Sequence, residues 1–293
     1  MNRFFKLAVP AVLLLLAASC STPTQTQTQA SSSTGTRSTA FPVIDQKGKV
    51  AVVAHRGFWK SEAGGMSENS IASLKAAQDA GFWGSECDIH ITSDDVVLVN
   101  HNNDINGKKI ATHKYSDFAD DLLPNGEKRP TLDEYLDQAA KCPATKLIIE
   151  FKSQPSEDRE DLLVEKTIAA LKAYKLYNPQ LVLFISFSRH ICDKVAAEHP
   201  AFINQFLSAQ VLKDEKPSRY AQRGINGVDY YFKMFDVRPE WVTEAHGLGM
   251  SVNAWTVDEE KDIKRMIEVG VDAITSNYPL LVREILGDKE LKN

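Results

Sequence analysis

The sequence predicts an α/β protein with a (β/α)8 TIM barrel, and three observations lead to this prediction. Eight short β-rich runs alternate with segments of helical periodicity, the pattern of eight strands each followed by a helix. Residues 41–293 provide the ~250 residues that one such barrel usually needs. Polar residues gather at the ends of the runs, where barrel strands carry their reactive groups. A doubly wound open sheet is the alternative.

The first run shows why these segments are predicted to be strands. Residues 50–54 are all apolar, and a continuous apolar run bounded by polar residues is typical of a strand buried on both faces. The eight predicted strands are Val50–His55, Gly84–His90, Leu147–Lys152, Leu181–Phe187, Phe206–Gln210, Val228–Phe232, Ser251–Thr256 and Ala273–Ser276. The predicted helices between them include Ser70–Ala80, Leu162–Tyr174, Arg238–His246 and Asp258–Val269.

A further run, Val96–His101, does not fit this repeat. It follows the second strand too closely for the crossover that a parallel neighbour needs, so it must return antiparallel as a β-hairpin. If Asp94 and Asp95 form a two-residue turn, Asp88 lies opposite His101, and the hairpin brings this histidine beside the strand ends. Residues 102–130 are rich in turn formers and predict a small insertion over the rim of the barrel.

Residues 1–20 predict a secretory signal. Basic residues precede the apolar stretch Leu7–Ala18, which is too short to span a bilayer comfortably. The segment ends in Leu16-Ala17-Ala18-Ser19-Cys20, which resembles the cleavage site of a bacterial lipoprotein with Cys20 as the lipidated first residue. A soluble protein with a cleaved signal is the alternative.

The next segment, residues 21–40, contains almost nothing that can be buried. It therefore predicts a flexible Ser/Thr/Gln-rich tether before a folded domain at residues 41–293. Because two or three acyl chains anchor a protein stably, we expect an exported protein held to a membrane, on the periplasmic face or at the cell surface. The formal net charge of −5 argues against nucleic acid as a partner, so local cations must hold any anionic ligand.

Three acidic residues are predicted to meet at the mouth of the barrel. Glu86 and Asp88 are two residues apart on one strand, so their side chains share a face, and Glu150 lies on the next barrel strand. Carboxylates pressed together out of water repel one another unless positive charge lies between them. A hard divalent cation, Ca2+ or Mg2+, is the ligand that this predicts. Structural ion pairs of Glu86 and Glu150 with Arg56 and Lys152 are the alternative.

Cations and imidazoles flank this predicted metal site. Arg56 and Lys152 bring fixed positive charge, and the planar fork of Arg suits phosphate oxygens, so they indicate a phosphoryl ligand. His55 and His101 are each at a strand end facing the carboxylates, and imidazole titrates near neutral pH. They are therefore candidates for a general acid and base pair. A structural role is the better prediction for four other histidines, His90, His113, His190 and His246.

Together these residues form an ordered set of motifs. The order and spacing resemble those of the glycerophosphodiester phosphodiesterase family in His55-Arg56-Gly57, Glu68-Asn69, Glu86-x-Asp88, Val99-x-His101 and Glu150-x-Lys152. The resemblance extends to Ala254-Trp255-Thr256-Val257 and Ser276-Asn277-Tyr278-Pro279, so it covers residues 50–285. There are two departures from the family pattern: Asn102 stands where the family usually has Asp, and Ser276-Asn277 stands where it usually has Thr-Asp.

The resemblance also implies a role for each residue. It implies that Glu86, Asp88 and Glu150 are metal ligands. It implies that His55 and His101 are an acid and base pair, and that Arg56 and Lys152 contact the phosphate. It places the Glu68-Asn69 pair at the substrate, with Asn69 contacting the phosphate or the metal. A helix N-cap is the alternative role of Asn69. Trp255 is expected to form an apolar wall for the substrate.

The activity that this resemblance implies is metal-dependent hydrolysis of a glycerophosphodiester to glycerol 3-phosphate and an alcohol. One alternative is a surface lipoprotein that binds a polyol phosphate without cleaving it, although a binder has no need of an acid and a base. The other is a phospholipase that acts on intact lipids, although the sequence contains no long amphipathic apolar lid.

Overall fold

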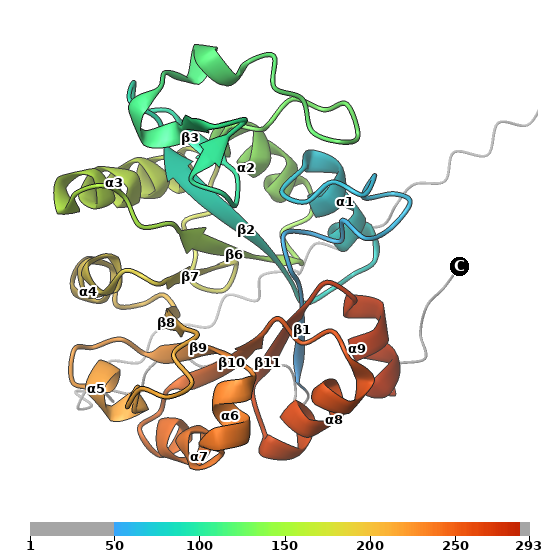
Figure 1. Cartoon of the computed structure of the whole chain (residues 1–293), viewed down its shortest axis with the longest axis vertical. Coiled ribbons are helices and arrows are strands. Elements are labelled where there is room, and N and C mark those ends of the chain that lie inside the picture. Colours follow the sequence, from blue (N-terminus) through green and yellow to red (C-terminus); the bar gives the residue numbers. More distant parts are fainter. Residues whose placement is uncertain (1–49, 288–293) are drawn as a thin grey trace, which may run out of the picture. The chain divides into compact units, whose positions relative to one another are not determined.

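The computed structural model of the protein describes residues 50–287, which Figure 1 draws in colour. Four predictions fall on the preceding segment and lie outside the described residues: the signal at 1–20, the lipidation site Cys20, the tether at 21–40 and the start of the domain at residue 41. Within residues 50–287, no helix combines the length and the apolar character that crossing a bilayer requires.

Eight parallel strands close into a barrel, which confirms the predicted fold. Its strands, in spatial order, are β1 (Ala51–Ala54), β2 (Gly84–Ile91), β6 (Lys146–Phe151), β7 (Val182–Ser186), β8 (Asn204–Ser208), β9 (Gly227–Tyr231), β10 (Ser251–Trp255) and β11 (Ala273–Ser276). The sheet has no open edge along this row because β1 pairs with both β11 and β2. The alternative of an open sheet is therefore wrong.

Helices surround this barrel on the outside, as Figure 1 shows. They are α1 (Ile71–Asp79), α2 (Leu132–Lys141), α3 (Glu157–Ala173), α4 (Arg189–Glu198), α5 (Pro217–Ala221), α6 (Lys233–Val237), α7 (Glu240–Gly247), α8 (Glu260–Val269) and α9 (Pro279–Ile285). Helix α3 begins five residues before its predicted start at Leu162 because its first turn carries no apolar periodicity. That turn is acidic and is capped by Ser156, and both features stabilise a helix N-terminus.

The strands are continuous apolar runs because both of their faces are buried. Residues that point into the barrel form one apolar cluster: Ala51, Val53, Ile148, Leu183, Ile185, Ile203, Leu207 and Ala273. The alternate residues pack outward against the helices in two larger clusters. A strand that contacts the apolar barrel interior on one face and the helices on the other needs no polar face. Its sequence is therefore a continuous apolar run.

The predicted hairpin exists, but its register is wrong by one residue. Strand β3 (Val97–Val99) runs antiparallel to β2 and pairs Val99 with Ile89. Asp88 consequently faces Asn100, whose backbone N–H donates to the Asp88 carbonyl oxygen at 3.0 Å, rather than His101. The reason is a longer turn, in which Asp95 adopts a left-handed φ of 65°, so three residues and not two separate Thr92 from Val96.

The insertion at residues 102–130 folds beyond the end of β2, at the top of Figure 1. It contains the short strands β4 (Asp104–Ile105) and β5 (Lys108–Lys109) and the 3-10 helices η1 (Ile110–Thr112) and η2 (Tyr115–Phe118). Its Ile105, Ile110 and Phe118 form a small apolar core together with Leu98 of β3. The insertion therefore holds its shape over one side of the barrel mouth.

The turn after β1 depends on Gly57, and this dependence can be tested. Gly57 has a φ of 81°, and a Cβ there would lie 2.3 Å from Ser73 Oγ, a residue of the α1 capping box. A non-glycine residue in the left-handed conformation costs about 1–2 kcal/mol. Gly57→Ala is expected to lower the free energy of unfolding by more than this, because the new Cβ also clashes with Ser73. Urea unfolding measures the loss.

Gly81→Ala is the matched control for that substitution. Gly81 is also left-handed, with a φ of 64°, but nothing lies within 4 Å of the place that a Cβ would take there. It should therefore lose only the strain contribution. Equal losses for the two variants would contradict the account of Gly57.

Candidate active site

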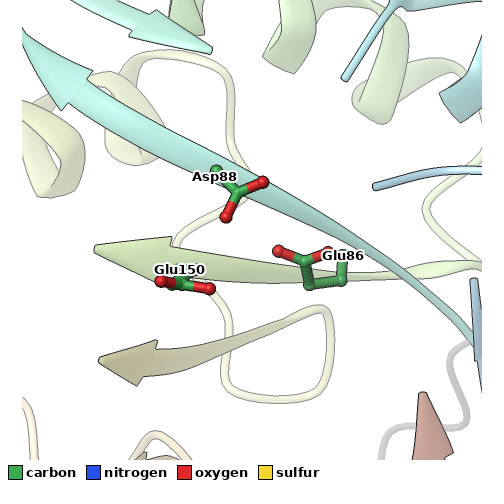
Figure 2. A group of neighbouring side chains, drawn as sticks. All are labelled: Glu86, Asp88 and Glu150. Atoms are coloured by element: carbon green, nitrogen blue, oxygen red, sulfur yellow. The ribbon is translucent and has the colours of Figure 1, made fainter. Parts of the chain in front are cut away.

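The three predicted carboxylates meet where the middle of β2 pairs with the C-terminal half of β6. Glu86, Asp88 and Glu150 are 2%, 1% and 8% exposed, and one ligand oxygen from each lies within 4.8 Å of the others. The register of the two strands sets Asp88 directly beside Glu150. Figure 2 shows the three carboxyl groups around a common space.

Two cations and one backbone N–H face this carboxylate cluster. Lys152 Nζ lies 2.8 Å from Asp88 Oδ1 and 2.7 Å from Glu150 Oε1, and Arg56 Nε lies 3.6 Å from Asp88 Oδ2. Glu86 accepts a hydrogen bond from the backbone N–H of Arg56 at 2.7 Å. Arg56 has a left-handed φ of 54°, a conformation that costs of order 1–3 kcal/mol for a non-glycine residue and marks functional sites.

The charges in the cluster are unevenly compensated. Burial raises the pKa of Glu86 well above its usual range, and the charges of Asp88 and Glu150 raise it further. Burial and the charge of Asp88 raise the pKa of Glu150 to about 8. Burial would also raise the pKa of Asp88, but the charges of Lys152, His101 and Arg56 outweigh it and hold this pKa below its usual value. The cluster therefore has room for more positive charge.

The donor set fits a hard divalent cation. Such ions take carboxylate oxygens as ligands, and Glu86 Oε1 is buried without any hydrogen-bond partner. The alternative of structural ion pairs accounts for Glu150, which Lys152 contacts, but it leaves this oxygen of Glu86 unexplained. Glu86, Asp88 and Glu150 are the residues that would hold the ion.

The two predicted histidines are each oriented by an asparagine. His55 Nδ1 lies 2.9 Å from Asn277 Oδ1, and His101 Nδ1 lies 2.9 Å from Asn102 Oδ1. Asn277 Nδ2 in turn donates to Asp258 Oδ2 at 2.8 Å, which fixes the amide so that its oxygen faces His55. An amide oxygen only accepts hydrogen bonds, so His55 carries its proton on Nδ1 and leaves Nε2 as the basic nitrogen.

The surroundings shift both imidazoles toward the neutral form. Burial, assisted by the charge of Arg56, lowers the pKa of His55 to about 4. Burial also lowers the pKa of His101, against the opposing charge of Asp88. The two departures from the family pattern thus place neutral amides beside the histidines, where carboxylates would have raised these pKa values.

The Glu68-Asn69 pair contacts the same cluster. Glu68 Oε2 accepts from Arg56 Nη1 at 2.7 Å. Asn69 Nδ2 donates to Asp88 Oδ2 at 2.8 Å, and Asn69 Oδ1 accepts from the Asp88 backbone N–H at 3.1 Å. Asn69 therefore fixes Asp88. The alternative role as helix N-cap is wrong, because Ser70 caps α1.

One cavity of about 160 Å³ joins most of these groups. The predicted residues that line it are His55, Arg56, Glu86, His101, Glu150, Lys152 and Trp255. Asp88 lies directly behind them, in contact with Lys152. The rings of Trp255 and Phe187 pack edge to face, with their centroids 5.6 Å apart. The predicted apolar wall therefore has two aromatic members.

No role was predicted from the sequence for three polar residues of this site, although Asn277 was named as a motif position. Asp258 and Asn277 orient His55, and Asp229 lines the cavity from β9. A signal for Asp229 was visible, since an acid stands inside the apolar run at residues 228–232. No local signal marks Asp258, which precedes α8 and reaches Asn277 only through the fold.

Comparison with known proteins identifies the family. The sequence model of the Glycerophosphoryl diester phosphodiesterase family matches residues 55–281. The chain belongs to this family. The predicted family is thereby confirmed, and with it the predicted enzyme class, a glycerophosphodiester phosphodiesterase.

Individual members of the family match along most of their length. A glycerophosphodiester phosphodiesterase of Caldanaerobacter subterraneus is 25% identical over 243 residues, which are 79% of this chain and 95% of that protein. One of Bacillus subtilis is 26% identical over 268 residues, or 81% and 86% of the two chains. The crystal structure of a glycerophosphodiester phosphodiesterase from Parabacteroides distasonis is 36% identical, with a TM-score of 0.78, over 83% of this chain and 99% of that one.

Proposed function

We propose that this member of the family hydrolyses glycerophosphodiesters to glycerol 3-phosphate and an alcohol, with a divalent cation and with His55 and His101 as the acid and base pair. The observation that carries the proposal is that both imidazoles line the one cavity that Glu86, Glu150, Arg56 and Lys152 also line. An Oleispira antarctica phosphodiesterase of the same fold, 21% identical with a TM-score of 0.70, has a structure in complex with the product sn-glycerol-3-phosphate.

The cations of the chain bind and orient the phosphodiester. Arg56 and Lys152 contact its nonbridging oxygens and neutralise the charge that grows on them, which is usually the largest contribution in such sites. Ca2+ or Mg2+, when bound to Glu86, Asp88 and Glu150, adds Lewis-acid neutralisation of the same charge. Glu68 and Asn69 act here too, since they position Arg56 and Asp88.

The histidines move the protons. One imidazole takes a proton from the nucleophile, which is water or the 2-hydroxyl of the substrate through a cyclic phosphate. The oxygen–phosphorus bond to the departing alcohol breaks, and the other imidazole gives that oxygen a proton. Because the surroundings lower the pKa of both rings, the negative charge of the bound phosphodiester would raise the pKa of the ring that acts as the acid.

A panel of substrates and metals tests this function. Glycerophosphocholine should be cleaved with Ca2+ or Mg2+ and not with EDTA, and His55→Ala and His101→Ala should each lower turnover by ~100-fold or more while substrate binding survives. His190→Ala is the matched control, because His190 pairs with Asp161 on the surface and should keep full activity. Full turnover in either active-site variant would remove that histidine from the mechanism.

The same panel decides between this function and its alternatives. A binder of polyol phosphates would retain glycerophosphodiesters without releasing glycerol 3-phosphate. A phospholipase would cleave diacyl lipids in preference to glycerophosphocholine. A lysophospholipase D of Rattus norvegicus, 22% identical over 80% of this chain, makes lysophospholipids worth including as a third class of substrate.

We also propose that the chain is exported and lipidated at Cys20. The support is the apolar stretch, the Leu16–Cys20 ending and the polar tether in the sequence. In a bacterial host, labelled palmitate should enter the wild-type chain and Cys142→Ser but not Cys20→Ser, which should leave the membrane fraction. Label in Cys20→Ser would contradict the proposal.

A further inference from the structure

A buried carboxyl on the opposite side of the barrel has no role in the chemistry above. Asp229 lies on β9, its side chain is 1% exposed, and it lines the same cavity as the two histidines. Its Oδ1 is buried without a hydrogen-bond partner, while Asn253 is the donor to the carboxyl group. Asn253 is held by Thr275, which also lines the cavity. The carboxyl is therefore fixed and half satisfied.

Packing does not explain this residue. An unsatisfied buried polar group costs about 1–3 kcal/mol, so an apolar side chain at position 229 would be the more stable choice. Among residues 50–287, Asp229 forms no ion pair, and the charge that acts on it most is Glu150, which has the same sign. It also lies outside the carboxylate cluster of the metal site. Because the buried carboxyl group lowers stability, its presence is better explained by binding of a ligand than by a structural role.

The surroundings of Asp229 define the chemistry of that ligand. Ile185, Leu207 and Trp255 line the cavity beside it, and they suit carbon atoms. Burial, with the charge of Glu150 added, raises the pKa of Asp229 well above its usual range, which favours the neutral carboxyl group over the carboxylate. A neutral carboxyl can donate and accept a hydrogen bond, which a hydroxyl group complements. A carbon chain with a hydroxyl at its end meets both conditions.

The two ends of the site differ in what they can take. At the inner end, Ile185, Leu207 and Asp229 are almost completely buried, so this end accepts only a small group. On the other side of His101 and Lys152 a second hollow is lined by Asn102, Asn103 and Ser153, which are exposed. The variable alcohol of a phosphodiester fits this exposed side, and the constant glycerol arm fits the buried one.

We propose that Asp229 binds the terminal hydroxyl of the glycerol arm and so selects glycerol phosphodiesters over diesters of shorter or deoxygenated alcohols. This inference rests on the proposed function. Asp229 is then a specificity residue on the far side of the cavity from the metal ligands. A site built to hydrogen-bond a hydroxyl rejects an analogue that lacks it, because the polar group of the protein is left unpaired.

A pair of substrates that differ in one hydroxyl tests the proposal. The first is glycerophosphocholine, and the second is the phosphocholine diester of propane-1,2-diol, which keeps the hydroxyl next to the phosphate-bearing carbon but lacks the terminal one. The wild-type enzyme with Ca2+ or Mg2+ should prefer the first by about 100-fold or more in kcat/KM. Asp229→Ala should reduce this preference to less than about tenfold by losing activity on the first substrate, and Asp229→Asn should keep part of it.

Two controls separate recognition from damage to the fold. Gln205→Ala removes a buried barrel residue that bonds Ser251 and does not line the cavity, so it should change kcat/KM for both substrates by the same factor. Asp229→Ala removes one unsatisfied oxygen but also deprives Asn253 of an acceptor, so its thermal midpoint should stay close to that of the wild type. Calorimetric binding of sn-glycerol 3-phosphate and of propane-1,2-diol 1-phosphate gives the same comparison without turnover.

Each contrary result has a distinct meaning. Equal cleavage of both diesters by the wild type, or full discrimination by Asp229→Ala, would overturn this inference and leave the proposed function intact. Cleavage of neither diester would overturn the proposed function, and equal binding of the two phosphates would then overturn this inference as well. Loss of divalent-cation binding in Asp229→Ala would show that the carboxyl serves a metal and not a hydroxyl.

Discussion

Three carboxylates buried at one point of the barrel mouth impose the constraint on which the rest of the site depends. Like charges held out of water repel strongly, so Glu86, Asp88 and Glu150 can share this point only if positive charge surrounds them. Lys152 and Arg56 supply part of it from the ends of β6 and β1. The left-handed Arg56 aims a backbone N–H at Glu86 as well. The remaining deficit of positive charge supports the proposal that the cluster binds a divalent cation and an anionic ester.

The surroundings of the two histidines follow from the same constraint. A hydrogen-bond partner at Nδ1 fixes the orientation of a histidine ring. Asn277 and Asn102 provide this partner with neutral amides, so they add no negative charge to the three carboxylates at the barrel mouth. Burial then keeps His55 neutral at pH 7. Asp258, set back behind Asn277, orients the amide from a position where its own charge faces two N–H donors.

The sequence predicted the barrel and the members of the cluster because both leave local patterns. Buried strands are continuous apolar runs, and polar residues at their ends are visible one strand at a time. The hairpin register was wrong because the turn spans three residues, Ser93 to Asp95, and the local sequence does not distinguish this turn from the predicted two-residue turn at Asp94 and Asp95. Asn69 was predicted to contact the phosphate or the metal, or to cap a helix. Its hydrogen bond to Asp88 was not predicted, because it forms only when the fold brings the loop before α1 next to β2. Asp229 shares a cavity with residues far away in the chain.

The most direct test of the central claim is a crystal structure of the enzyme grown with Mn2+, located by its anomalous signal. The account predicts one ion with an oxygen of each of Glu86, Asp88 and Glu150 among its ligands, at distances of about 2.0–2.6 Å. It also predicts the imidazoles of His55 and His101 facing the cavity beside that ion. An ion bound elsewhere, or an empty cluster at saturating Mn2+ with Lys152 still between the acids, would contradict it.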